Sequence, residues 1–184
     1  TLKPVVENLK GRTYIISGGS RGIGYNIAKK LALQGANVTI TGKTEVAHPK
    51  LEGTIYSAEE KIVELTQRPS CMAVPCDIRN PNDIDLAVSE TLDVYGRIDG
   101  VILNASALCL NSTLNQTQKE IDLMTSVNIK GSFLMGQKCL KYIQYSDHGC
   151  ILTIAPPMQM LYEDDWWINH LYYSMSKFNM SLMS

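Results

Sequence analysis

Short apolar runs alternate with longer amphipathic segments along this chain. The runs have strand length, whereas the segments between them carry apolar residues at helical spacing. Regular alternation of strand and helix is typical of βαβ units, in which parallel strands form one sheet with helices on both faces. The pattern therefore predicts an α/β fold with a doubly wound parallel sheet, in a single domain over residues 1–184.

The same pattern gives the expected bounds of the elements. Strands are expected at Thr13–Ile16, Ala36–Thr41, Cys71–Pro75, Gly100–Leu103 and Cys150–Ile154. Helices are expected at about 23–34, 57–65, 82–95 and 117–145, and a last helix carries Tyr173 and Lys177. Ser57, with Glu60 three residues later, has the pattern of a helix-starting capping box, and Gly96 is a natural helix end.

Composition narrows the class of protein. The chain is 45% hydrophobic and 19% charged with a net charge of -1, which is the profile of a soluble globular domain. It has no long block of one charge and no run near the ~20 apolar residues of a membrane span, so neither nucleic acid nor a membrane is an expected partner. Five cysteines without a Cys-x-x-Cys pair suggest an intracellular location, in the cytoplasm or a mitochondrial or peroxisomal matrix. The three scattered histidines lack metal-ligand spacing, so no metal site is expected.

Three glycines lie between the first strand and the first helix. Gly18, Gly22 and Gly24 leave the backbone free to approach a pyrophosphate, and the N–H groups at the helix start would face that anion. A plain tight turn is the alternative, but the buried strand before it favours a dinucleotide site. Arg21 within the turn and Lys43 after the second strand, with no acidic residue there, favour NADP(H) over NAD(H), unless both are solvated surface charges.

Tyr173 and Lys177 are spaced to lie on one face of the last helix. A cation beside a phenol favours phenolate and lowers its pKa from about 10. Spacing alone favours an ordinary exposed pair on a helix surface. Together with the glycine turn, the pair becomes a candidate device for donating a proton.

These motifs resemble those of the short-chain dehydrogenase/reductase family, and the resemblance covers essentially the whole chain. The family turn is Thr-Gly-x-x-x-Gly-Ile-Gly, its catalytic pair is Tyr-x-x-x-Lys, and its fold is of Rossmann type. Lys43-Thr44 and the segment 48–56 are similar to the hydroxysteroid-dehydrogenase-like branch. Here the turn reads Ser17, Gly18, Gly19, Ser20, Arg21, Gly22, Ile23, Gly24.

The resemblance implies roles for particular residues. The whole turn, Lys43, Asp77, Asn104, Ala105, Ser106 and Lys177 would bind NADP(H), with Asp77 holding the adenine amino group. Tyr173 would donate a proton during reduction of a carbonyl, Lys177 would lower the pKa of Tyr173 and hold the nicotinamide ribose, and Asn128 would order a relaying water. Leu103 and Ser106 depart from the family segment Asn-Asn-Ala-Gly.

One family residue is missing. After the fifth strand the family has a serine that hydrogen-bonds the carbonyl oxygen, but this chain has Ala155 and Pro156, whose side chains donate nothing. Loss of such a donor typically costs about 10²–10³ in rate. We therefore expect a slow oxidoreductase, and the alternative is an NADP(H)-binding protein for sensing or interaction with little turnover.

The resemblance also gives expectations about substrate, assembly and length. Tyr162, Trp166 and Trp167 lie in the family's substrate loop and fit an apolar steroid, acyl or retinoid substrate, although ordinary loop packing is the alternative. Family members are commonly homodimers or homotetramers. They also continue with two more strands, so we expect this chain to be incomplete at its C-terminus.

Overall fold

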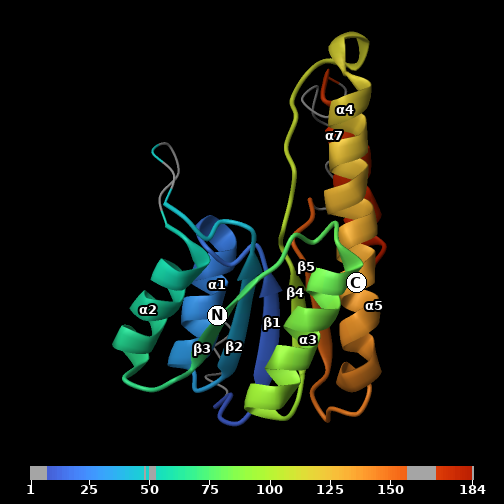
Figure 1. Ribbon diagram of the computed structural model, residues 1–184. Coiled ribbons are helices and arrows are strands. Elements are labelled where there is room, and N and C mark those ends of the chain that lie inside the picture. The colour runs from blue at the N-terminus through green and yellow to red at the C-terminus, as the bar shows by residue number, and fades with distance from the viewer. Residues whose placement is uncertain (1–7, 48, 50–52, 157–168, 184) are drawn as a thin grey trace, which may run out of the picture.

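The computed structural model describes residues 8–47, 49, 53–156 and 169–183. Its centre is a parallel sheet with the strand order β3-β2-β1-β4-β5 (Figure 1). The order of the strands reverses at β1, because β2 and β3 lie on one side of it and β4 and β5 lie on the other. The expected parallel sheet is confirmed, with strands at β1 Thr13–Ser17, β2 Asn37–Gly42, β3 Cys71–Pro75, β4 Gly100–Leu103 and β5 Cys150–Thr153.

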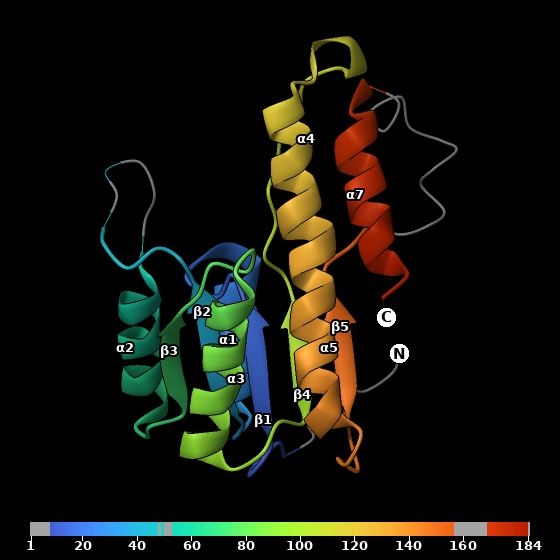
Figure 2. The same ribbon diagram turned by 45° about the vertical axis from the view of Figure 1, so that its right-hand side comes forward.

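Helices cover both faces of this sheet, as the sequence pattern predicts (Figure 2). Successive residues of β1 point to opposite faces. Ile15 packs in a core with α3 and α5, whereas Tyr14 and Ile16 pack in a second core with α1 and α2. The described helices of these layers are α1 Gly22–Leu33, α2 Ile55–Thr66, α3 Pro81–Tyr95 and α5 Ser132–Ile143.

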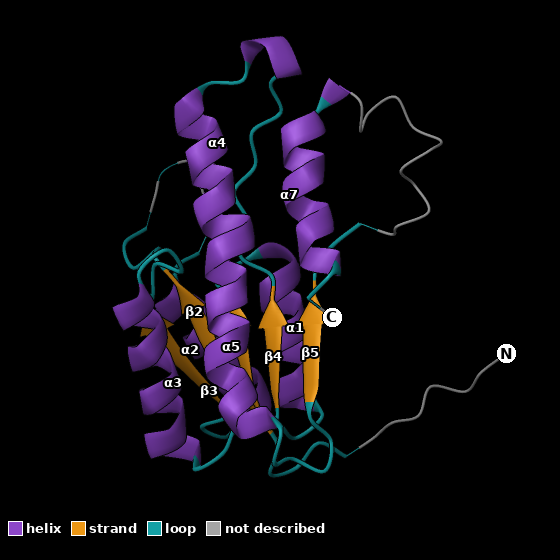
Figure 3. Ribbon diagram, turned by 90° about the vertical axis from the view of Figure 1, so that its right-hand side faces the viewer, coloured by secondary structure: helices purple, strands orange, loops and turns teal. Residues whose placement is uncertain are grey.

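The helical region expected at 117–145 is present but changes its pitch. It consists of α4 Gln118–Met124, a π-helical turn at Thr125–Gly131, and α5. The last helix, α7 Leu171–Ser181, lies beside this column above the carboxyl ends of the strands (Figure 3). The π-helical turn therefore lies where the column meets α7, which brings Asn128 opposite Ser176.

Two local expectations need correction. Helix α2 begins earlier than Ser57, because Thr54 is its N-cap and its hydroxyl accepts a hydrogen bond from the Ser57 N–H at 3.0 Å. Ser57 completes this capping box by accepting from the Thr54 N–H at 2.8 Å. Ile154 lies just beyond β5, although its N–H still donates to Leu103 O at 3.0 Å.

The carboxyl ends of β1, β2, β3 and β4 meet at one edge of the sheet. In open α/β sheets this edge, where the strand order reverses, is where ligands bind. A network around Asp99 ties the opposite edge together, because its carboxylate accepts from the Thr13 N–H at 2.8 Å and from Ser146 Oγ at 2.5 Å. Within the described residues, no helix is both long and apolar enough to cross a membrane.

Candidate functional site

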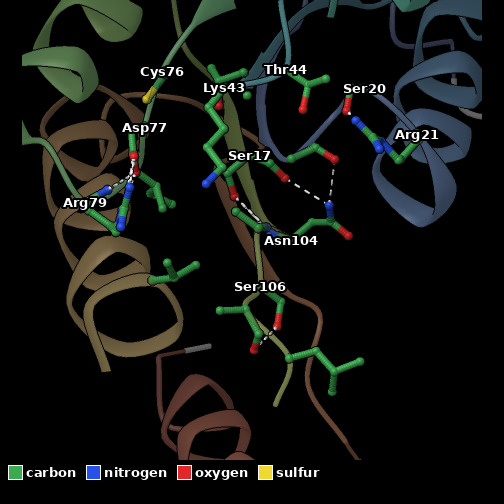
Figure 4. Close-up of a pocket in the computed structure, with 18 of the residues that line it drawn as sticks. Ser17, Ser20, Arg21, Lys43, Thr44, Cys76, Asp77, Arg79, Asn104 and Ser106 are labelled. Carbon is green, nitrogen blue, oxygen red and sulfur yellow. Dashed lines mark hydrogen bonds and ion pairs between the residues drawn. The ribbon is translucent and has the colours of Figure 1, made fainter. Parts of the chain in front are cut away.

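A cavity of about 540 Å³ opens at the carboxyl edge of the sheet (Figure 4). Segments that follow four different strands line it, and they include most of the residues that the sequence predicts to bind NADP(H). The lining residues used below are Ser17, Gly18, Ser20, Arg21, Lys43, Asp77, Arg79, Asn104, Ala105 and Ser106.

The glycine turn is shaped so that side chains do not fit in it. Gly18 has a φ of +71°, in the left-handed region that favours glycine. A Cβ at Gly24 would lie 2.4 Å from Gly18 O, and a Cβ at Gly19 would lie 2.6 Å from Ile40 Cβ. Helix α1 therefore starts in direct contact with the turn, and its first N–H groups are close to the cavity.

Ser17 and Asn104 hold the turn against the end of β4. The Ser17 hydroxyl accepts from the backbone N–H of Asn104 at 3.0 Å and of Ala105 at 3.1 Å. The Asn104 side chain donates back to Ser17 O at 2.9 Å and to Gly18 O at 3.0 Å. Both hydrogens of the Asn104 amide are thus used, and the cavity floor is a cross-linked piece of backbone.

Basic side chains surround the cavity. Figure 4 shows Arg21 and the Asp77–Arg79 pair on opposite sides, with Lys43 between them. Arg21 Nη2 donates to Gly53 O at 3.3 Å, which brings the guanidinium toward the start of α2. The structure therefore brings together the two cations, Arg21 and Lys43, that the sequence singles out.

Asp77 has a partner that the sequence analysis did not identify. Arg79 Nε donates to both of its carboxylate oxygens, at 2.9 and 3.0 Å, and Arg79 Nη2 forms an ion pair with the same carboxylate. These bonds hold the pKa of Asp77 below its usual value. The role of Asp77 toward adenine stays a prediction, in which Arg79 would share the site.

A second cavity, of about 310 Å³, lies on the other side of the loop after β4. Its described lining comes from α1, from the segment after β5 and from α7. Asn104 and Ser106 line both cavities, so this loop forms their shared wall. The lining residues are Ile23, Asn104, Ser106, Ile154, Ala155, Pro156, Tyr173 and Lys177.

Tyr173 and Lys177 both face the second cavity, as their helical spacing predicts. The pKa of Tyr173 is raised, because burial outweighs a side-chain hydrogen bond with Ser106 that lowers it. The expected lowering of that pKa by Lys177 is therefore not found in this arrangement. Lys177 is itself buried and donates to Met180 Sδ at 3.3 Å, and burial lowers the pKa of its ammonium to about 8.

Asn128 is fully buried and joins three segments around the second cavity. Its Oδ1 accepts from the Ala107 N–H at 2.7 Å, and its Nδ2 donates to Ala107 O at 3.0 Å and to Ser176 Oγ at 2.9 Å. The side chain thus links the loop after β4 to α7. The water-ordering role of Asn128 stays a prediction. Its hydrogen bonds show a structural link between the loop and α7 that sequence reasoning missed.

The segment after β5 contributes no side-chain hydroxyl. Ala155 and Pro156 line the second cavity at the position where the family has its serine. Tyr162, Trp166 and Trp167, expected in the substrate loop, lie outside the described residues. The position of Ser106 in the same cavity lining as Tyr173 was missed as well, although the departure of Ser106 from the family glycine was the available signal.

Comparisons with known proteins agree with this geometry. The family model described as "short chain dehydrogenase" matches residues 12–184. The chain is 41% identical, over 97% of its length, to hydroxysteroid dehydrogenase-like protein 2 of Xenopus tropicalis, and 40% identical to the Homo sapiens protein of that name. It spans 42% of each of these relatives, which is less than half of their length.

Two crystal structures are also similar. A protein from Xanthomonas campestris superposes with a TM-score of 0.87 and 43% identity, over 96% of this chain and 64% of that one. A short chain dehydrogenase from Mycobacterium thermoresistibile gives a TM-score of 0.85 and 38% identity, over 95% of this chain and 61% of that one. Similarity in both sequence and fold therefore extends across both cavities.

Proposed function

The chain belongs to the short-chain dehydrogenase family of oxidoreductases, and we propose that it interconverts a carbonyl and a secondary alcohol with NADP(H). The family binds a nicotinamide dinucleotide. The observation that carries the proposal is the shared wall between the two cavities. A cofactor that lies along it would have its phosphates at the glycine turn and its reactive ring beside Tyr173.

Charge supports the choice of NADP(H). A 2′-phosphate is a dianion that cations stabilise and a carboxylate at the end of β2 would repel. Here Gly42 ends β2, Lys43 follows it, and Arg21 lies across the cavity. The carboxylate of Asp77 is already paired with Arg79, so it presents less negative charge to the phosphate.

The chain's own residues would handle the proton. The bound cofactor supplies the hydride that reduces the carbonyl carbon. Tyr173 donates its phenolic proton to the substrate oxygen, and the resulting phenolate recovers a proton from solvent. Lys177 would stabilise that phenolate when its ammonium turns from Met180 toward the second cavity. Although burial lowers its pKa to about 8, the ammonium is still mostly charged at neutral pH.

The second cavity suggests the class of substrate. Ile23, Ile154 and Pro156 give it an apolar wall. A bulky apolar carbonyl compound, such as a steroid, acyl or retinoid derivative, fits this lining. We also propose a homo-oligomer, because family members generally are oligomers, and light scattering on purified protein would test it.

Cofactor binding and turnover are tested separately. Fluorescence titration with NADPH and NADH should show tighter binding of NADPH. Arg21→Ala and Lys43→Ala should each weaken NADPH binding about tenfold, which corresponds to about 1.4 kcal/mol, and should leave NADH binding nearly unchanged. Lys30→Ala, on the exposed side of α1, is the matched control. If these variants lost as much affinity for NADH as for NADPH, the proposed role of Arg21 and Lys43 in binding the 2′-phosphate would be contradicted.

Turnover is measured with a panel of apolar ketones and alcohols. Tyr173→Phe should abolish it and leave NADPH binding intact, because the phenol is placed at the reacting oxygen and not at the phosphates. NADPH binding without turnover of any substrate would favour the alternative binding protein. Failure of the wild-type chain to bind either cofactor would reject both functions.

A further inference from the structure

The second cavity contains few groups able to hydrogen-bond a substrate oxygen. Among its described lining residues, side-chain hydroxyls occur at Tyr173 and Ser106. Asn104 has both amide hydrogens committed to the glycine turn, and Lys177 Nζ donates to Met180. Ala155 and Pro156 add no donor, so the two side-chain hydroxyls of the described lining lie where the loop after β4 faces α7.

Ser106 occupies that position. It lies in the wall that both cavities share, faces the same cavity as Tyr173, and its side chain lowers the pKa of the Tyr173 phenol. Its hydroxyl is also 3.4 Å from Ala107 O, at the limit for a hydrogen bond, so it is weakly held there. A hydroxyl with one weak backbone contact can rotate toward a stronger acceptor.

The neighbouring residue fixes the backbone on which Ser106 stands. Asn128 bonds both the N–H and the C=O of Ala107, at 2.7 and 3.0 Å, and is itself bonded to Ser176 of α7. The loop and the helix that carries Tyr173 are thus joined one residue away from Ser106. A donor held in this way needs little rearrangement when charge develops beside it.

We propose that Ser106 supplies the hydroxyl that the segment after β5 lacks, by donating its one hydrogen bond either to the Tyr173 oxygen or to the substrate oxygen beside it. This inference rests on the proposed function. During reduction the substrate oxygen gains negative charge and then the phenolic proton, and the phenol becomes phenolate. The Ser106 hydroxyl stabilises whichever of the two oxygens carries the charge and transfers no proton itself.

The direct test follows the titration of Tyr173, which requires no turnover. Protein labelled with ¹³Cζ-tyrosine is titrated by NMR, and the Tyr173 signal is assigned by its loss in Tyr173→Phe. In Ser106→Ala the pKa of Tyr173 should rise, because phenolate loses a hydrogen-bond donor. Ser89→Ala, an exposed serine on α3, should leave the titration unchanged. An unchanged titration in Ser106→Ala overturns the proposal.

The catalytic part is tested by rate. Ser106→Ala should lower kcat about 10²-fold and leave the dissociation constant of NADPH within about twofold of wild type. Adding Ala155→Ser to that variant should restore a large part of kcat by returning a hydroxyl from the β5 side. A shifted titration with unchanged kcat would reduce Ser106 to a structural contact and overturn the proposal.

The two proposals fail in distinguishable ways. If Tyr173→Phe removes turnover but Ser106→Ala does not, the proposed function stands and the role of Ser106 falls. If wild-type protein turns over nothing while the Tyr173 titration still shifts in Ser106→Ala, the contact is real, and the function and the catalytic role both fall.

Discussion

Asn128 donates a hydrogen bond to the Ser176 hydroxyl at 2.9 Å, across two helical segments that lie far apart in the sequence. Ser176 in turn donates to Tyr173 O at 2.8 Å, one helical turn earlier in α7. The buried amide of the π-helical turn is therefore connected to the backbone of the residue that we place at the reacting oxygen. The position of Tyr173 depends on this chain of contacts.

Replacement of Asn128 by alanine should destabilise the protein. The change leaves the N–H and C=O of half-buried Ala107 without their partner, and an unsatisfied group costs up to about 1–3 kcal/mol when it is buried. Chemical denaturation should show a loss of about 2–4 kcal/mol in the free energy of unfolding. Asn82→Ala, at an exposed position in the first turn of α3, should change it by less than about 0.5 kcal/mol. Equal stability of the two variants would show that the hydrogen bonds of Asn128 to Ala107 and Ser176 do not stabilise the fold.

Replacement of Gly24 by alanine should abolish cofactor binding. The new Cβ would lie 2.4 Å from Gly18 O and 2.6 Å from Asn104 Nδ2, so the turn must move away from α1. NADPH titration should show a loss of at least about 10²-fold in affinity, which corresponds to roughly 3 kcal/mol.

Gly96→Ala is the control for this variant. Gly96 ends α3 with a φ of +74°, and an added Cβ there meets no atom within 4 Å. Its replacement should lower the melting temperature because of backbone strain but leave NADPH affinity unchanged. If both variants lost a similar amount of NADPH affinity, the cause would be a general loss of stability and not a clash at the glycine turn.

Lys177→Met should stabilise the fold while removing activity. Burial lowers the pKa of Lys177 to about 8, whereas an unfolded lysine titrates near 10.4, so the unfolded chain binds more protons between these values. The cost of burying the charged form is therefore full below about pH 8 and disappears as the pH rises toward ~10.4. At pH 7 the stabilisation should be at most about 3 kcal/mol.

Denaturation curves from pH 7 to 10.5 measure this effect. The difference in stability between Lys177→Met and wild type should shrink as the pH rises. Lys30→Met, at an exposed site in α1, should give a small difference that does not vary with pH in this way. If the stability difference between Lys177→Met and wild type did not change with pH, burial would not destabilise the charged form of Lys177.

Asp99 should support stability down to acidic pH. Burial raises its pKa, but hydrogen bonds from Arg97, Ser146 and the Thr13 N–H outweigh this effect and hold the pKa below its usual value. The stabilisation is therefore present above about pH 3.9, the unfolded value, and is lost as the pH falls through the lower folded value. Asp99→Asn should cost about 1.5–3 kcal/mol at pH 7.

The pH dependence distinguishes a carboxylate effect from simple loss of packing. The stability difference between Asp99→Asn and wild type should narrow as the pH falls below about 4, because the Asp99 carboxyl then binds a proton more readily in the unfolded chain than in the folded protein. Asp93→Asn, at an exposed position on α3, should neither lose stability at pH 7 nor show a stability difference that changes below pH 4. A difference that persists unchanged at pH 3 would assign the effect to packing.

The strands β1, β2 and β4 were predictable because burial on both faces leaves a continuous apolar run. The bounds of β3 and β4 agree with the prediction to the residue, since polar or turn residues flank both runs. The start of α2 was not predictable with the same accuracy. Thr54 and Ser57 are both residue types that favour the N-cap position. In the structure Thr54 has the extended backbone of an N-cap, and the helix begins at Ile55.

The site was predictable in its members but not in its contacts. Helical spacing placed Tyr173 and Lys177 on one face, but it did not show that Nζ turns toward Met180. The glycine motif identified the turn, whereas the pairing of Asp77 with Arg79 depends on side-chain rotamers after β3. Likewise, nothing in the local sequence distinguishes a π-helical turn from an α-helical one at 125–131, because tertiary contacts of Asn128 favour it.

The wall shared by the two cavities has an evolutionary consequence. Arg21 and Lys43 face one cavity only, and Ile154 and Ala155 face the other, so substitutions there can tune cofactor preference or substrate fit independently. Asn104 and Ser106 face both, so a bulkier side chain at either position would alter both cavities at once. The loop after β4 is therefore the part of the molecule where adaptation to a new substrate is most constrained by retention of the cofactor.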